Sequence, residues 1–386
     1  MQFQGYRRPD GRVGVRNHVV VMPGCLCSTI AARKICQAVE GVTYLENPNG
    51  CAQNSRDTAI TLEIISGLIA NGNVYGVLIV GNGCETIQED RYRAEIGAKT
   101  NKPVEYISIQ GEGGLKKTVE KGVALITAMK AQADQCKREP CDLSELTLGL
   151  ECGGSDPTSG LSSNVVLGWV SDYLVDAGGT AILAETPEAI GAENILRDRG
   201  ATPEVGQRIY DMIMHCEKQH LDDGEDVRNC NPSPGNKAGG ITTLEEKSIG
   251  CIHKSGTRPF VGAYEYGQLV DQKGLVFMDG TAFDVASTVS LIAGGAQVVV
   301  FTTGRGNPVG APTAPVIKVT GNHETYEWLN DILDMDTSAS ISGEKTVEEL
   351  GREMLDLVVR VCNGEPVKAE LNGCNEMCID QLSGYC

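Results

Sequence analysis

A repeated order of segments constrains the fold of this chain more than any other feature: a short β-branched run, a glycine-containing turn, and a helix-type segment. The run HVVVMP (18–23) precedes the turn GCLCS and the helical pattern of TIAARKICQAVE (29–40). In the second half, LTLGLE (146–151) precedes a glycine-rich turn and the helical pattern of SNVVLGWVSDYLVDAG (163–178). Such short apolar runs are typical of strands buried on both faces. Because buried parallel strands are joined by helices, this order predicts an α/β fold with mainly parallel, Rossmann-like sheets.

A polar stretch divides the chain into two such series. QCKREPCDLSE (135–145) contains a proline and is typical of a linker. We therefore predict two Rossmann-like domains, an N-terminal α/β domain at 1–137 and a C-terminal α/β domain at 146–386. Their loops are expected to be long and glycine-rich, because 47 of the 386 residues are glycine, above the average of about 7%.

The charge balance narrows the range of partners. The chain has 33 Lys and Arg against 51 Asp and Glu, for a formal net charge of −18. A chain this acidic repels phosphate backbones and anionic lipid surfaces, so we expect neither nucleic acid nor a membrane as partner. The longest apolar runs are far shorter than the roughly 20 residues of a membrane span, and the N-terminus has no signal-peptide pattern. The sequence therefore predicts a cytoplasmic protein.

Cysteine is frequent and its placement is informative. Fifteen cysteines are scattered along the chain, and the odd number excludes a complete set of internal disulfides. Cys27, Cys51, Cys84 and Cys152 each follow a predicted strand, where ligands gather in open α/β sheets. Thiolates in these positions could bind iron, zinc or an iron–sulfur cluster. The glycine-rich turns also leave a nucleotide-binding module open, although neither GxGxxG nor GxxxxGK[ST] is present.

The longest Gly/Pro-rich stretch is CNPSPGNKAGGITTLEEKSIGCIHKSG (230–256). It has the character of an irregular loop, and loops of this length in compact domains are usually functional or disordered. This stretch carries Asn236, Lys237, Lys247 and His253. We interpret it as a functional loop.

A set of segments extends over nearly the whole chain and is specific when taken together. These are GYRRPDGRVGVRNHVVVMP (5–23), GVLIVGNGCE (76–85), LECGGSDPTSGLSSN (150–164), ETPEAIGAE (185–193), NPSPGNKAGGITTLEEKSIG (231–250), KSG (254–256), FTTGRG (301–306) and LDMD (333–336). With this set, the chain resembles the altronate/galactarate dehydratase family, which also includes the large subunit of sulfolactate sulfo-lyase.

The resemblance implies an iron-dependent lyase that carries out a β-elimination on a small 2-hydroxy acid. A sugar-acid member loses water and forms a 2-keto-3-deoxy acid, whereas a sulfolactate member releases sulfite and pyruvate. The metal implied is a four-iron cluster on Cys51, Cys84 and Cys152, with one iron open to substrate. The alternative is a mononuclear Fe(II) site that uses Glu85 or Asp156.

The chemistry needs a base for the proton next to the carboxylate and positive charge where the enediolate develops. The resemblance makes Lys247, His253, Lys254 and Glu85 the catalytic candidates. The substrate-binding candidates are Ser155, Asp156, Asn236, Lys237, Thr302, Thr303 and Arg305.

Two departures from the family pattern bear on substrate and partner. Sugar-acid members carry an additional small SAF-type domain, and this chain begins directly at the GYRR segment. We therefore expect either that a separate small subunit supplies the SAF domain or that the chain is active without it. We also expect a homo-oligomer. The loop before Cys51 reads ENPNGC, where sugar-acid members have a histidine, which argues against altronate or galactarate. An alternative of another class is a non-catalytic iron–sulfur protein that transfers electrons.

Overall fold

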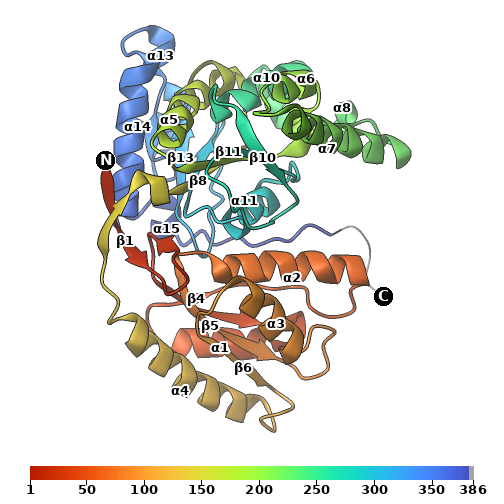
Figure 1. The fold of residues 1–386 in the computed structure, drawn as a ribbon, viewed down its shortest axis with the longest axis vertical. Helices are drawn as coiled ribbons and strands as arrows, with labels where there is room; N and C mark the ends of the chain where they lie inside the picture. Colours follow the sequence, from red (N-terminus) through yellow and green to blue (C-terminus); the bar gives the residue numbers. More distant parts are fainter. Residues whose placement is uncertain (382–386) are drawn as a thin grey trace.

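The computed structural model describes residues 1–381 and contains two parallel sheets (Figure 1). The larger has seven strands in the order β10-β11-β9-β8-β12-β13-β14, and the smaller has four in the order β4-β3-β5-β6. All pairings within both sheets are parallel. The predicted α/β class with parallel, Rossmann-like sheets is confirmed.

The smaller sheet is built from the first third of the chain. Its strands are β3 (His18–Pro23), β4 (Val42–Tyr44), β5 (Val74–Gly81) and β6 (Val104–Ser108), and its helices are α1 (Thr29–Ala38), α2 (Ser55–Ala70), α3 (Glu89–Lys99) and α4 (Leu115–Ala133). Successive side chains of β3 point to opposite faces. Val19 and Val21 pack with α1 and α4, whereas Val20 and Met22 pack on the side of α2.

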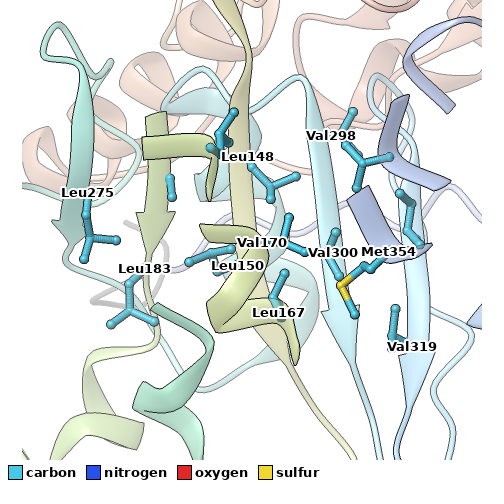
Figure 2. Close-up of a cluster of buried hydrophobic side chains, with 14 of the residues drawn as sticks. Leu148, Leu150, Leu167, Val170, Leu183, Leu275, Val298, Val300, Val319 and Met354 are labelled. Atoms are coloured by element: carbon cyan, nitrogen blue, oxygen red, sulfur yellow. The ribbon is translucent and has the colours of Figure 1, made fainter. Parts of the chain in front are cut away.

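The larger sheet uses strands from residue 147 onward. They are β8 (Thr147–Cys152), β9 (Thr180–Leu183), β10 (Phe260–Tyr264), β11 (Gly274–Met278), β12 (Val298–Thr302), β13 (Val316–Thr320) and β14 (Met335–Asp336). Figure 2 shows the core on one face of this sheet, where Leu148 and Leu150 of β8 lie against Leu167 and Val170, with Met354 nearby. Leu167 and Val170 belong to α5 (Asn164–Asp176), and Met354 belongs to α14 (Val347–Cys362).

The remaining elements are short except for one helix. They are η1 (Leu26–Ser28), η2 (Leu143–Glu145), η3 (Ser159–Ser163), η4 (Thr186–Ala189), α6 (Glu193–Asp198), α7 (Pro203–Asp222), α8 (Val227–Cys230), α9 (Pro234–Gly239), α10 (Leu244–Ile252), η5 (His253–Ser255), α11 (Asp284–Ala293), α12 (His323–Trp328), α13 (Ala339–Ser342) and α15 (Lys368–Leu371). No helix among residues 1–381 is both long and apolar enough to cross a lipid bilayer.

One continuous hydrophobic core joins the two sheets. Helix α11 covers the second face of the larger sheet and packs directly against α2 of the smaller one, at the boundary between the two halves in Figure 1. The cluster includes Ile79 from β5, Ile64 from α2, Ile292 from α11 and Val299 from β12. The halves are therefore packed through shared apolar side chains.

The stretch expected to be a linker contains a strand. β7 (Glu139–Asp142) pairs antiparallel with β1 (Gln2–Arg7), and β1 also pairs with β2 (Val13–Gly14). Phe3 and Cys141 lie opposite each other and are both buried, which gives this small sheet its apolar face. The division at 1–137 and 146–386 stays a prediction, with this third sheet at its boundary.

The stretch 230–256 is helical, in contrast to the irregular loop expected from its glycines and prolines. Ser233 caps α9 through the backbone amide of Asn236, and the Thr243 side chain caps α10 through that of Glu246. These caps satisfy amides that a helix start otherwise leaves unpaired. The helices present the polar residues of this stretch in fixed positions.

The C-terminal segment after α15 runs back to the smaller sheet. The backbone amide of Gly310 donates to Glu376 Oε2 at 2.9 Å, and the side chain of Gln381 hydrogen bonds with Asn49. Between these contacts, Ile379 is buried in the core that the two sheets share. The segment thus contacts both halves of the molecule.

A buried lysine on β13 provides a stability test. Lys318 is fully buried, with its Nζ 4.0 Å from the centre of the Phe301 ring, and burial lowers its pKa to about 7. The unfolded chain therefore binds more protons than the folded chain between pH 7 and the ordinary lysine pKa, so this residue makes stability rise with pH in that window. We expect the stability of Lys318→Met relative to the parent to fall by about 3 kcal/mol between pH 7 and pH 10.

Urea unfolding of both proteins at several pH values measures this difference. Groups remote from Lys318 titrate alike in both chains, so their effects cancel in the comparison. A difference that stays constant from pH 7 to pH 10 would contradict the lowered pKa.

Candidate metal and substrate site

A cluster of buried polar side chains lies beyond the carboxyl ends of β8 and β9, which are neighbours in the larger sheet. Cys152 is the last residue of β8, and Glu185 follows β9 directly before η4, which carries Glu188. Helix α10 brings Cys251 to the same place, and η5 adds Lys254. The carboxyl edge of a parallel sheet is where ligands bind in open α/β folds.

Four of these side chains could hold a metal ion together. One potential ligand atom from each of Cys152, Glu185, Glu188 and Cys251 lies within 4.8 Å of the others, and all four residues are buried. Two sulfurs and two carboxylates combine soft and hard donors, a set suited to a divalent transition ion such as iron or zinc. The donor chemistry therefore fits a metal.

Lys254 supplies positive charge in the middle of this group. Its Nζ lies 3.1 Å from the sulfur of Cys152 and 3.1 Å from that of Cys251, and it forms an ion pair with Glu185. Burial by itself lowers the pKa of Lys254, but the surrounding sulfurs and carboxylates outweigh burial and raise it well above the usual value. Lys254 is therefore held as an ammonium that balances part of the negative charge of the cluster.

Burial also shifts the pKa values of the acidic side chains of this cluster. Burial raises the pKa of the Glu185 carboxyl well above its usual range. For the Cys152 thiol, the contact with Cys251 and burial both raise the pKa. A metal ion would favour the deprotonated forms of these groups, so metal binding is expected to release protons.

The backbone at Glu185 is strained. Its φ is 72°, a left-handed conformation that it shares, among the non-glycine residues of 1–381, with Ala52. A non-glycine residue held there costs about 1–3 kcal/mol and tends to mark a functional site. The chain turns at Glu185, two residues after β9 ends, and the side chain of Glu185 belongs to the buried cluster.

Two further carboxyls lie behind the cluster. Glu151 is fully buried and accepts a hydrogen bond from Ser287 Oγ at 2.6 Å. Burial raises the pKa of Glu151 to about 8 and that of Asp284 to about 6. One oxygen of Glu151 is buried without a hydrogen-bond partner.

A cavity of about 250 Å³ opens next to the cluster. Cys152, Cys251, Lys247 and His253 contribute to its lining together with Ser155. This volume is below the roughly 300–1,000 Å³ of pockets for drug-sized ligands, so it suits a small metabolite. The Ser155 hydroxyl is buried and has no hydrogen-bond partner, which leaves it available to a bound molecule.

Lys247 is fixed at the boundary between the cavity and the metal-capable group. Its Nζ donates to Glu188 Oε1 at 2.5 Å and to Asn231 Oδ1 at 2.9 Å. Burial opposes the charged form, but Glu188 more than compensates and raises the pKa of Lys247 above its ordinary value. A permanently charged ammonium at this position can stabilise negative charge on a molecule in the cavity.

The other substrate-binding candidates differ in burial and in hydrogen bonding. Asn236 Nδ2 donates to the carbonyl of Ser155 at 2.9 Å, and Thr302 Oγ1 donates to Asn164 Oδ1 at 2.5 Å. Their polar groups are thus already paired. The carboxylate of Asp156 accepts hydrogen bonds from Thr158 and Asn322. Thr303 is buried beside Gly154. Lys237 and Arg305 are both exposed.

The remaining candidates lie in the loops that follow β4 and β5 of the smaller sheet. Cys51 is half-buried, Cys84 is exposed, and Glu85 is buried with its carboxylate accepting from Tyr106 at 2.8 Å and from the backbone of Gly83 at 2.6 Å. Within residues 1–381, the one group of three or more metal-capable side chains includes Cys152 but neither Cys51 nor Cys84. Whether these residues bind metal stays a prediction.

Sequence reasoning missed three members of the metal-capable group: Glu185, Glu188 and Cys251. A signal existed for the first two, because Glu185 ends the strand-type run TAILAE (180–185) and TPE, with Glu188, follows it. Cys251 had a weaker signal in the HKS segment (253–255), which begins two residues after it. Nothing in the local sequence shows that these segments meet Cys152.

Comparisons with known proteins agree over nearly the whole chain. The sequence-family model of the D-galactarate/altronate dehydratase C-terminal domain matches residues 143–383. The family model of the second domain of D-galactarate dehydratase/altronate hydrolase matches residues 5–134. Altronate dehydratase of Bacillus subtilis is 36% identical over 387 residues, which cover 98% of this chain and 77% of that protein. The (2R)-sulfolactate sulfo-lyase subunit beta of Chromohalobacter salexigens is 33% identical, with 98% of this chain and 97% of that protein covered. Galactarate dehydratase (L-threo-forming) of Escherichia coli is 32% identical, with 94% and 73% covered.

Proposed function

The chain belongs to the D-galactarate/altronate dehydratase family of lyases, and from this premise we propose that it eliminates water from a small 2-hydroxy acid with the help of divalent iron. The observation that carries the proposal is the buried group Cys152, Glu185, Glu188 and Cys251 next to a small cavity. These four residues would hold the metal. When bound, iron would supply Lewis acidity toward the carboxylate and hydroxyl oxygens of the substrate.

The donor set favours a single metal ion over a four-iron cluster, with ligands other than the Glu85 or Asp156 expected from the sequence. Iron–sulfur clusters are held mainly by cysteine thiolates, whereas half of this group consists of carboxylates. The same reasoning argues against an electron carrier. The three-cysteine cluster on Cys51, Cys84 and Cys152 remains a separate prediction, to be tested by sulfide analysis.

Residues of the cavity would bind the substrate and stabilise the charge that develops. The Ser155 hydroxyl would donate to a substrate oxygen, and Lys247 would face the negative charge of the enediolate. Since Lys247 and Lys254 are both held protonated, neither suits the role of base. We assign that role to His253, which lines the cavity and is exposed at its edge, where its imidazole would accept the proton next to the carboxylate.

A second candidate reaction is release of sulfite from a sulfolactate-type acid. It is supported by the 33% identity between this chain and the sulfo-lyase subunit over 386 residues. The relative is called subunit beta, so this alternative also predicts a separate small subunit as partner. The same cavity would serve both reactions, since both remove the proton next to the carboxylate and a leaving group from the neighbouring carbon.

The test is an assay of protein purified without oxygen and supplied with Fe²⁺. Altronate, galactarate and sulfolactate are offered in turn, and keto-acid formation and sulfite release are measured together with iron and acid-labile sulfide. Iron-dependent keto-acid formation without sulfite supports the dehydratase, and sulfite release supports the alternative. An iron-loaded protein that produces no keto acid from these or related hydroxy acids, with or without a small partner subunit, would contradict the lyase mechanism at this site.

Ser155→Ala tests the position of the substrate. The hydroxyl has no partner in the protein, so its removal breaks no hydrogen bond within the fold and is expected to cost at most about 1 kcal/mol of folding stability. Loss of one hydrogen bond to substrate corresponds to about tenfold in KM. Steady-state kinetics and thermal unfolding measure the two effects, and an unchanged KM would place the substrate elsewhere.

A further inference from the structure

The sulfurs of Cys152 and Cys251 are close although the residues are far apart in sequence. They lie 3.6 Å from each other, one at the end of β8 and the other in α10. Among residues 1–381, no other two cysteine sulfurs hydrogen bond with each other. A disulfide has a sulfur–sulfur distance of about 2.05 Å, so a bond would require the two sulfurs to approach by roughly 1.5 Å.

Small molecules can reach this pair. Both cysteines line the cavity of about 250 Å³, whose rim includes the exposed side chains of Leu161 and Ile249. The other buried cysteines, Cys25, Cys141 and Cys362, do not line it. A peroxide that enters the cavity therefore meets two neighbouring sulfurs.

Lys254 holds the pair in a shared geometry. Its Nζ donates to both sulfurs at 3.1 Å, so both sulfurs face the same ammonium group. The three side chains thus place the two sulfurs side by side, each in contact with the same donor.

We propose that Cys152 and Cys251 form a reversible disulfide when a peroxide enters the cavity. One thiolate attacks a peroxide oxygen, the O–O bond breaks, and a sulfenic acid forms while the departing hydroxide takes a proton and becomes water. The second thiolate attacks the sulfenic sulfur, the S–O bond breaks, and a second water leaves. In sum, two thiols and one hydrogen peroxide give one disulfide and two waters.

The disulfide and a bound metal exclude each other, and this part of the inference rests on the proposed function. Both sulfurs of the metal-capable group are consumed in the disulfide, which leaves Glu185 and Glu188 alone. Metal loss under oxidising conditions would then be followed by a link that protects the sulfurs from irreversible oxidation. A thiol reductant restores the site.

The experiment uses the full chain, reduced, freed of metal with a chelator and treated with hydrogen peroxide. Free thiols are blocked with an alkylating agent in denaturant, and proteolytic peptides are identified by mass spectrometry. We expect a linked pair of peptides containing Cys152 and Cys251 that dithiothreitol separates. Cys362→Ser is the matched control, since that cysteine is equally buried but remote from the cavity, and it should form the link as the parent does.

Several outcomes would overturn the disulfide. Recovery of both cysteines as free thiols, as unlinked sulfinic acids, or joined through oxygen to Lys254 would each do so. Protein preloaded with Zn²⁺, which does not react with peroxide, should form the link at least about tenfold more slowly if the metal uses these sulfurs. Equal rates with and without zinc would overturn the metal site, and the linked peptides would still establish the disulfide.

Discussion

Replacing Cys251 with serine is expected to remove bound metal and to lower lyase turnover by at least about 100-fold. Even residues that only support metal ligands cost about 10–100-fold when changed, and Cys251 provides one of the two sulfurs of the group. Serine keeps the approximate size of the side chain, so the fold should persist. Metal content per chain after gel filtration, together with turnover at saturating substrate, measures the effect.

The control for this substitution is again Cys362→Ser. Cys362 is fully buried in α14 and belongs to the core beneath the larger sheet. Its replacement is expected to lower stability while metal content and turnover stay at the parent level. Full metal occupancy in Cys251→Ser would show that the metal is held elsewhere, with the loops of Cys51 and Cys84 as the next place to examine.

The second large effect concerns folding stability. Lys254→Met is expected to destabilise the metal-free protein by about 3–5 kcal/mol, the range observed when one partner of a buried ion pair is removed. Lys254 is completely buried, and its removal leaves Glu185 and two sulfurs without their shared cation. Urea unfolding in the presence of a chelator measures the loss.

Bound metal should reduce the loss of stability in Lys254→Met, because a divalent cation would replace the missing positive charge. A metal present at about 100 times its Kd adds about 2.7 kcal/mol to the folded state. Lys121→Met is the matched control: its ion pair with Glu112 is half-exposed, and such pairs contribute at most about 1 kcal/mol. If both lysine variants lose the same small amount of stability, Lys254 does not act as the counter-ion of the cluster.

The fold could be predicted because buried parallel strands leave a strong local pattern. HVVVMP and VYGVLIVG become β3 and β5, and their apolar, β-branched character follows from burial on both faces. The stretch 230–256 was less predictable. Glycine and proline are typical of loops, but Pro234 lies in the first turn of α9 and Gly240 ends it, positions where helices tolerate both residues.

The site could be predicted only in part. Cys152 follows a strand, and Lys247 and Lys254 lie in the polar stretch that indicated function, so local patterns pointed to them. Glu185 and Cys251 meet Cys152 because β9 lies beside β8 and α10 packs against η4. Strand order in the sheet is set by long-range packing, and a single sequence contains no direct record of it.

The C-terminal segment has a consequence for synthesis of the chain. Ile379 completes a core whose other members include Val20 and Met22, more than 350 residues earlier. At about 5–20 residues per second, a ribosome needs roughly 20–70 s to pass from one to the other. Throughout that time the apolar faces of β3 and α2 lack their final cover, so we expect the nascent chain to expose part of this core until residue 379 has left the ribosome.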